Sequence, residues 1–363
     1  MIPTTMNAIV LTGHGGLDKL EYRTDWPTPS PGADQVLIKV AACGMNNTDV
    51  NTRAGWYSKA VTEATTGGAY DTVGDDDGTW GGSGVSFPRI QGADVCGTVV
   101  ATGANAPHDL IGKRVITDNW LRNWDDPLNK NTTGYFGSEA DGGYAQYCVI
   151  DHRNVGVVNS DLTDAELATF SCSYTTAEGM LSRAQVKAGD RVLITGASGG
   201  VGSALIQLAN RRGAITIAMA SPAKHAEVTA LNPNHILGRA PDDLAATLQS
   251  ETGHDKVDVV CDIVAGPYFP TLIEQIERGG HYATSGAIAG PIVDLDVRTL
   301  YLQDLTFHGS TVVEPRIFRD LIRYIEAGEI KPVLAATYPL SDFHAAQTAF
   351  IDKAHTGNIV VIP

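Results

Sequence analysis

Four glycines fall within the seven residues from Gly196 to Gly202, a spacing that suits the binding of a phosphate group. The preceding run, Arg191 to Thr195, is β-branched and apolar, which predicts a buried parallel strand. From Val201 to Ala209 the apolar residues recur at the spacing of one helix face. Glycines in such a strand-to-helix turn let the backbone approach a pyrophosphate, and the N–H groups at the helix start stabilise its charge. The segment therefore predicts dinucleotide binding by Ser198, Gly199, Gly200 and Val201.

A second group of candidate binding residues follows the expected second strand, Ala214 to Ala220. In NAD sites an Asp or Glu at this strand end bonds the ribose 2′-hydroxyl and would repel a 2′-phosphate. This chain has Ser221 and Lys224 there and no carboxylate, which favours NADP(H), with Arg239 as a further candidate contact. The alternative for Lys224 is a surface lysine on the next helix.

Length and composition limit the classes of protein that fit. A chain of 363 residues with 43% hydrophobic and 18% charged residues is expected to form two globular domains. Its net charge of -15 argues against nucleic acid or an anionic membrane as the main partner. The five cysteines include no CxxC pair, so no disulfide framework is expected. Because no signal-peptide pattern and no long apolar run occurs, we expect a cytoplasmic protein without a membrane span.

The elements that would position the candidate residues fall into two parts of the chain with different secondary-structure patterns. Short β-type runs dominate residues 7–151 without a long amphipathic helix, which predicts an irregular β domain. From Leu162 onward strand and helix patterns alternate, which predicts an α/β fold with a doubly wound parallel sheet. Leu305 to Gly309 is a candidate edge strand where a homodimer could form. The other expected strands are 8–11, 36–42, 95–102, 114–117, 144–150, 257–262, 280–285 and 359–362, and the expected helices include 222–231, 268–276, 317–326 and 343–350.

Two long irregular segments, Ser58 to Phe87 and Asp118 to Gly137, interrupt the β part. Loops of this length are usually functional or mobile. Four of the five tryptophans lie in or beside them: Trp56, Trp80, Trp120 and Trp124. They predict either an aromatic-walled cleft or lid, or rings that pack against one another to fix the loops.

Taken together, these motifs resemble the medium-chain dehydrogenase/reductase superfamily along nearly the whole chain. Within it, the segments Asp141-Gly142-Gly143-Tyr144-Ala145 and Tyr174-Thr175-Thr176-Ala177 and the Ala-Ser-Gly-Gly-Val-Gly loop look like the zinc-independent quinone oxidoreductase branch. The resemblance implies a GroES-like substrate domain at 1–155, completed by 310–363, and a Rossmann NADP(H)-binding domain at 156–309. It also implies a cleft between them where nicotinamide meets a small, possibly aromatic substrate.

The resemblance also implies roles for individual residues. Asn46 and Thr176 would approach the nicotinamide, Tyr57 would face the cleft as a stacking wall or proton donor, and Asn46 and Tyr57 would be catalytic. The loop Gly286, Ala287 and Ile288 would line the nicotinamide pocket. The alternatives are a turn-capping amide for Asn46, a helix N-cap for Thr176 and ordinary packing for Tyr57.

A catalytic zinc needs three nitrogen or sulfur ligands and an open position. Asn46 and Ala93 stand at the first two ligand positions of the zinc alcohol dehydrogenases, and Cys172 alone matches the third. The segment Asp118 to Gly137 lacks the cysteines of a structural zinc lobe, so no metal is expected. An acidic metal site at Asp75-Asp76-Asp77 is the alternative to a solvated loop.

Without a Lewis acid, a substrate activated by conjugation fits best, so we expect NADPH to reduce a quinone or an α,β-unsaturated carbonyl. Two alternatives stay open: an alcohol or aldehyde oxidoreductase of the same superfamily, and an NADPH-binding sensor without turnover. The short-chain reductases share the Thr195-Gly196-xxx-Gly200-x-Gly202 pattern. Their Tyr-xxx-Lys pair is missing from this chain, so this family is set aside.

Overall fold

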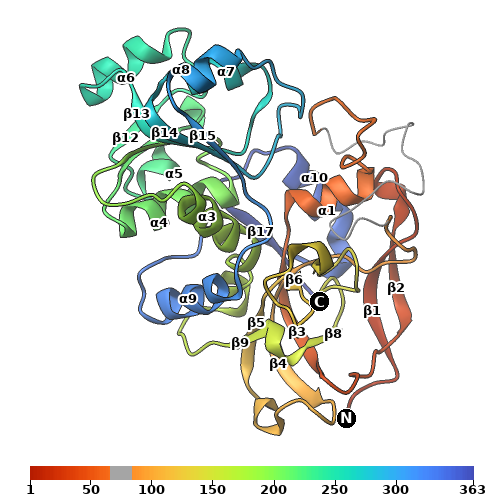
Figure 1. The fold of residues 1–363 in the computed structure, drawn as a ribbon. Coiled ribbons are helices and arrows are strands. Elements are labelled where there is room, and N and C mark those ends of the chain that lie inside the picture. Colours follow the sequence, from red (N-terminus) through yellow and green to blue (C-terminus); the bar gives the residue numbers. More distant parts are fainter. Residues whose placement is uncertain (66–83) are drawn as a thin grey trace. The chain divides into compact units, whose positions relative to one another are not determined.

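The computed structural model describes residues 1–65 and 84–363, and the chain divides into two compact units (Figure 1). Unit 1 consists of Met1–Val61, Thr66–Cys172 and Glu314–Pro363, and unit 2 of Thr62–Thr65 and Ser173–Val313. The first boundary lies later than the predicted residue 155, because strand β9 (Val155–Val157) pairs with β5 (Arg114–Thr117) inside unit 1. The expected Asp75-Asp76-Asp77 site and Trp80 lie outside the described residues.

Unit 2 contains the predicted doubly wound sheet, which confirms the α/β, Rossmann-type fold class. Its six strands are all parallel, in the order β12-β11-β10-β13-β14-β15. Helices α4 and α5 lie on one side of the sheet and α6 and α7 on the other (Figure 1). The strands are β10 (Arg191–Ile194), β11 (Ile215–Met219), β12 (His235–Leu237), β13 (Val257–Asp262), β14 (Ile276–Thr284) and β15 (Thr306–Gly309). The helices are α3 (Ser171–Arg183), α4 (Gly200–Arg211), α5 (His225–Thr229), α6 (Leu244–Thr252), α7 (Phe269–Glu274) and α8 (Val297–Leu302).

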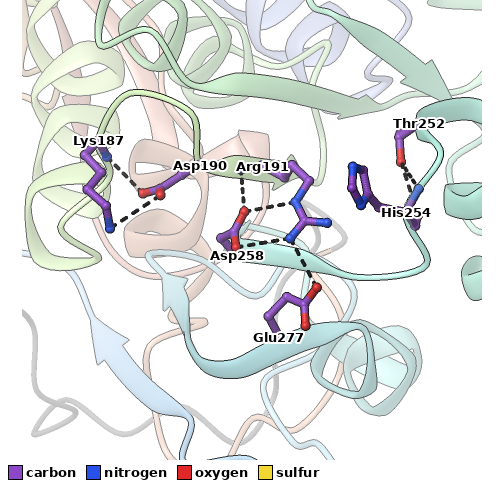
Figure 2. A network of polar contacts seen from close by, with 7 residues as sticks. All are labelled: Lys187, Asp190, Arg191, Thr252, His254, Asp258 and Glu277. Atoms are coloured by element: carbon purple, nitrogen blue, oxygen red, sulfur yellow. Dashed lines mark hydrogen bonds and ion pairs between the residues drawn. The ribbon is translucent and has the colours of Figure 1, made fainter.

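Ion pairs fix the amino ends of three of these strands (Figure 2). Arg191, the first residue of β10, donates to Asp258 of β13 at 3.0 Å and to Glu277 of β14 at 3.1 Å. This charge network links the three strands at their amino ends. It leaves the opposite edge, where the carboxyl ends lie, for ligand binding, as is usual in open α/β sheets.

Unit 1 is the predicted irregular β domain. Its seven-stranded sheet runs β16-β17-β3-β4-β5-β9, with β8 paired to β3. These strands are β16 (Leu334–Pro339), β17 (Asn358–Ile362), β3 (Gln35–Gly44), β4 (Asp94–Thr102), β5, β9 and β8 (Tyr147–Asp151). Two smaller sheets pair β1 (Thr5–Leu11) with β2 (Leu20–Pro27) and β6 (Trp120–Leu121) with β7 (Gly134–Tyr135). Its helices are α1 (Asn47–Ala54), α2 (Asp164–Leu167), α9 (Pro315–Glu326) and α10 (Phe343–Ile351).

The described tryptophans pack within unit 1. The Trp56 ring meets Tyr57 edge-on at 5.7 Å, and the Trp120 ring meets Tyr135 edge-on at 5.2 Å. Trp124 donates to Asn154. These contacts favour rings that anchor the loops, although the partners differ from the predicted tryptophan-to-tryptophan packing.

Candidate active site

The glycine turn forms the start of helix α4 as predicted. Gly199 is extended at the N-cap, and the helix begins at Gly200. A Cβ at Gly202 would lie 2.2 Å from the carbonyl oxygen of Gly196, so only glycine allows helix and strand to approach this closely. The first N–H groups of a helix have no partner within it and favour an anion. The residues at this turn therefore fit a dinucleotide pyrophosphate.

The predicted 2′-phosphate residues lie at one edge of the unit 2 sheet. Ser221 follows the end of β11 by two residues, and Arg239 follows the end of β12 by two. These strands are adjacent and parallel, so their ends meet at the same edge. Lys224 is half-buried, and burial lowers its pKa. No Asp or Glu occurs between Met219 and Lys224, so the local side chains fit a phosphate.

A buried carboxylate that the sequence analysis did not single out joins three strand ends. Asp262, at the end of β13, accepts hydrogen bonds from the hydroxyl groups of Thr195 and Tyr282, the latter at 2.6 Å. It also accepts from the backbone N–H groups of Val264 and Ala265. Ala265 has φ 51° and ψ -135°, a conformation that a residue with a Cβ rarely adopts. Asp262 thus holds the strained turn at the carboxyl edge.

The loop Gly286 to Ile288 lies against that turn. The N–H of Ala289 donates to the Val264 carbonyl at 2.8 Å, and that of Ile288 donates to the Ile263 carbonyl at 3.4 Å. Ile263 also approaches the glycine turn, because a Cβ at Gly196 would lie 3.1 Å from its side chain. The structure therefore brings the glycine turn and the predicted loop together at one edge of unit 2.

Thr176 lies inside helix α3 and is half-buried. It is the sixth residue of that helix, so it is not an N-cap, and that alternative is wrong. The stretch Tyr174 to Ala177, which contains Thr176 and carries part of the family resemblance, is helical throughout.

Unit 1 holds the other candidate residues around helix α1. Asn46 is the N-cap of this helix, and its backbone N–H donates to Asp49 Oδ2 at 2.8 Å. The Tyr144 hydroxyl donates to the same oxygen at 2.6 Å. Burial raises the pKa of Asp49 to about 6, and these two donors oppose the rise. Asn46 therefore occupies the capping position that the alternative foresaw, with its side chain in the capping box of α1 and its buried amide nitrogen without a partner among the described residues.

Tyr57 lies two residues after Gly55, the left-handed cap residue of helix α1. Its hydroxyl donates to Thr48 Oγ1 at 3.1 Å. Burial raises the pKa of Tyr57 to about 12, while hydrogen bonds with Thr48 and Asn51 lower it. The hydroxyl thus keeps its proton at neutral pH and can act as a hydrogen-bond donor.

The fully buried Arg53 fixes this helix in unit 1. Its Nε donates to Gln347 of α10 at 2.9 Å, and its Nη1 donates to the Gly15 carbonyl. The guanidinium therefore ties α1, and with it Asn46 and Tyr57, to two separate parts of the unit.

Two of the three zinc ligand positions carry side chains without the nitrogen or sulfur ligand that zinc needs. Asn46 offers a neutral amide, Ala93 offers a methyl group, and Cys172 receives a hydrogen bond from the Tyr135 hydroxyl at 3.4 Å. Across residues 1–65 and 84–363, no three His, Cys, Asp or Glu side chains gather in a way that could hold an ion. The described residues therefore do not fit a zinc ion.

Comparisons with known proteins agree with this architecture. Residues 32–160 match the alcohol dehydrogenase GroES-like domain, and residues 200–327 match the zinc-binding dehydrogenase domain. A candidate alcohol dehydrogenase from Sinorhizobium meliloti 1021, whose crystal structure is known, is 46% identical with a TM-score of 0.90, and the match covers 100% of this chain and 98% of that one. None of the helices in the described part of the chain is long and apolar enough to cross a membrane.

Two characterised relatives match the chain over its length. Human quinone oxidoreductase is 25% identical over 98% of this chain and 98% of its own. The chloroplastic NADPH-dependent alkenal/one oxidoreductase of Arabidopsis thaliana is 27% identical over 100% of this chain and 81% of its own. The fold, the glycine turn and these matches agree, and the chain belongs to the medium-chain dehydrogenase/reductase superfamily of nicotinamide-dependent oxidoreductases.

Proposed function

We propose that this oxidoreductase uses NADPH to reduce quinones or α,β-unsaturated carbonyl compounds without zinc. The observation that carries the proposal is the replacement of two zinc ligand positions by Asn46 and Ala93, while a hydrogen-bond donor, Tyr57, is positioned by the same helix α1. The names of the human and Arabidopsis relatives support the same substrate class.

The bound NADPH would supply the hydride. In unit 2, the N–H groups at the start of α4 would bind its pyrophosphate. Ser221, Lys224 and Arg239 would bind its 2′-phosphate, since two of them are cations and the segment from Met219 to Lys224 contains no Asp or Glu. Asp262 would hold the loops at the strand ends in the conformation that binds the nicotinamide. Ser198, Thr176 and the segment from Gly286 to Ile288 remain proposed contacts.

In unit 1, Asn46 and Tyr57 would act on the substrate oxygen. As hydride adds to a conjugated carbon, negative charge develops on this oxygen, and hydrogen-bond donors stabilise it by about 2.7–4 kcal/mol each. The Asn46 amide would donate a hydrogen bond, and the Tyr57 hydroxyl, which Thr48 orients, would deliver the proton. A saturated ketone offers no such delocalisation, so the proposal favours conjugated substrates.

A spectrophotometric assay tests the proposal. We expect NADPH oxidation with enones or quinones at unchanged rates after EDTA treatment, and weaker turnover with NADH. Activity confined to alcohols or aldehydes and lost on chelation would support the zinc-dependent alternative instead. Tight NADPH binding without turnover of any of these compounds would support the sensor alternative.

The Tyr57→Phe variant separates the two roles considered for this ring. If the hydroxyl delivers the proton, kcat for enone reduction should fall about 100-fold, with little change in the KM for NADPH. A ring that only stacks would leave kcat within a few-fold of the wild type. Tyr57→Ala serves as the comparison, because it removes both functions.

We further propose that unit 2 pairs with a second copy of this chain. Residues Ile292, Val297, Tyr301 and Leu302 each expose more than half of their surface, which is unusual for such apolar side chains in one segment. They directly precede β15, which lies at the edge of the six-stranded sheet as predicted. Exposed strand edges pair readily with another chain.

Analytical ultracentrifugation tests this pairing. The double variant Tyr301→Asp/Leu302→Asp should shift a dimeric wild type toward monomer. The control Ile111→Asp changes an equally apolar exposed residue of unit 1 and should remain dimeric. A wild type that is monomeric at micromolar concentration would contradict the proposal.

A further inference from the structure

Two short turns of unit 2 carry the residues proposed to bind the 2′-phosphate of the cofactor. The first, Ser221 to Lys224, follows strand β11. The second, Gly238 to Asp243, connects strand β12 to helix α6 and contains the exposed Arg239. Long cationic side chains lose conformational entropy when they are held in one place. The contacts that hold each turn therefore decide how well its cation can meet a phosphate.

The imidazole of His225 holds the first turn. Its Nε2 lies 3.2 Å from the carbonyl oxygen of Ala220, the residue directly after β11. Because a carbonyl oxygen only accepts hydrogen bonds, Nε2 carries the proton and donates it to this bond. Within the same turn, the Lys224 N–H donates to the Ser221 carbonyl at 2.9 Å. His225 thus closes the turn against the end of β11, with Ser221 and Lys224 between the two ends.

The hydroxyl of Tyr268 holds the second turn. It donates to the carbonyl oxygen of Pro241, two residues after Arg239, at 2.9 Å. Tyr268 ends the 3₁₀ helix Gly266–Tyr268, which follows the turn that Asp262 holds. Its ring packs against the apolar core of unit 2, so the hydroxyl is presented from a fixed base.

Carboxylates in the second turn make its conformation important. Asp242 and Asp243 lie in the same turn as Arg239. Burial and then these two carboxylates raise the pKa of Tyr268, so both carboxylates lie near its hydroxyl. A phosphate would be attracted by Arg239 and repelled by Asp242 and Asp243. A turn that was free to move would bring both signs of charge to the phosphate, and its net attraction would be small.

We propose that His225 and Tyr268 are positioning residues for the 2′-phosphate of NADPH. His225 acts through Lys224, because it keeps the ammonium group of that residue at the end of β11. Tyr268 acts through Arg239, because it keeps the guanidinium toward the phosphate and the carboxylates of the turn away from it. The inference rests on the proposed function and deepens it, since it names the side chains that make the site select NADPH over NADH.

Calorimetric titration of the whole protein with NADP⁺ and with NAD⁺ tests the inference, because these cofactors differ only in the 2′-phosphate. The ratio of the Kd for NAD⁺ to the Kd for NADP⁺ should fall about 3–10-fold in His225→Ala and in Tyr268→Phe, as expected for one lost hydrogen bond. A residue with a merely structural role would, on substitution, weaken the binding of both cofactors alike. An unchanged ratio in these variants would therefore overturn the proposal.

His225→Gln is the matched control for the first turn. Its side-chain NH₂ group can donate to the Ala220 carbonyl in place of the imidazole Nε2. The ratio of the two Kd values should therefore stay close to that of the wild type. A Gln variant that loses as much as His225→Ala would show that the hydrogen bond to Ala220 does not position Lys224.

Double variants test whether each residue acts through its cation. When Arg239 is already replaced by Ala, Tyr268→Phe should change the ratio little further. When Lys224 is already replaced by Ala, His225→Ala should likewise have little further effect. Full, additive losses in these backgrounds would mean that the residues act independently, and the proposal would be wrong.

The result for the wild type separates this inference from the proposed function. A wild type that binds NADP⁺ no more tightly than NAD⁺ would overturn the inference, even if it reduced enones or quinones with NADH. The expected ratios in a protein without turnover of enones or quinones would instead count against the proposed substrate class alone.

Discussion

The variant Asp262→Ala is expected to lose about 3–5 kcal/mol of unfolding free energy, the largest loss predicted for a single substitution in unit 2. The carboxylate accepts hydrogen bonds from the hydroxyl groups of Thr195 and Tyr282 and from two backbone N–H groups, and all of these donors would lose this partner. Ala265 would also lose the hydrogen bonds that hold its strained backbone. Urea-induced unfolding followed by circular dichroism measures the loss.

The control for this prediction is Tyr282→Phe, which removes one donor and leaves the carboxylate in place. Its loss should be about 0.5–1.5 kcal/mol, the net contribution of a single hydrogen bond. We also expect NADPH to raise the melting temperature of Asp262→Ala less than that of the wild type, because the strand-end loops would no longer be fixed. A loss below about 1 kcal/mol in Asp262→Ala would show that Asp262 does not join the strand ends as described.

The variant Ser221→Asp is expected to reverse the preference for the cofactor. A carboxylate at this strand end would bond the ribose 2′-hydroxyl of NADH and repel the 2′-phosphate of NADPH. Juxtaposed like charges cost several kcal/mol, so the ratio of kcat/KM for NADPH to that for NADH should fall by at least about 100-fold. Steady-state kinetics with both cofactors and one enone measure the ratio.

Ala226→Asp is the matched control, since it adds the same charge on the exposed side of α5, a few residues away. Its cofactor ratio should stay close to that of the wild type. An unchanged ratio in Ser221→Asp would mean that the 2′-phosphate does not bind at the end of β11, and NADP(H) would lose its main support.

The sheet of unit 2 was predictable because its strands are buried on both faces and read as continuous apolar runs. Strand β13 has the predicted bounds, Val257 to Asp262, and β11 and β14 differ from the prediction only at their ends. The short β12 was missed, since three residues, His235 to Leu237, are too few for a pattern to be recognised.

In unit 1, helix α1 was not predicted from the sequence, for a different reason. Its residues, from Asn47 to Ala54, are mostly polar and yet nearly all buried, so no apolar stripe marks one face. The buried Arg53 shows how tertiary contacts stabilise this helix in place of its own propensity. Patterns that detect surface helices cannot find a helix that is covered on every side.

The candidate site was predictable in part. Glycine spacing located the phosphate turn, and the absence of an acidic residue after β11 pointed to Ser221 and Lys224. Asp262 was missed because its role depends on a partner distant in sequence, Tyr282. The sequence did contain one signal for Asp262, because this residue ends an apolar run that reads as a strand.

The way unit 1 is assembled from both ends of the chain has a consequence for synthesis on the ribosome. Strand β3 pairs at Cys43 and Gly44 with β17, which is made only when the last residues emerge. At about 5–20 residues per second, the growing chain waits roughly 10–40 s after Cys172 for this strand. During that interval an apolar sheet edge stays open to other nascent chains, and unit 2, which is nearly continuous in sequence, can mature first. Translation speed through the second half of the message thus sets how long this edge stays without its partner strand.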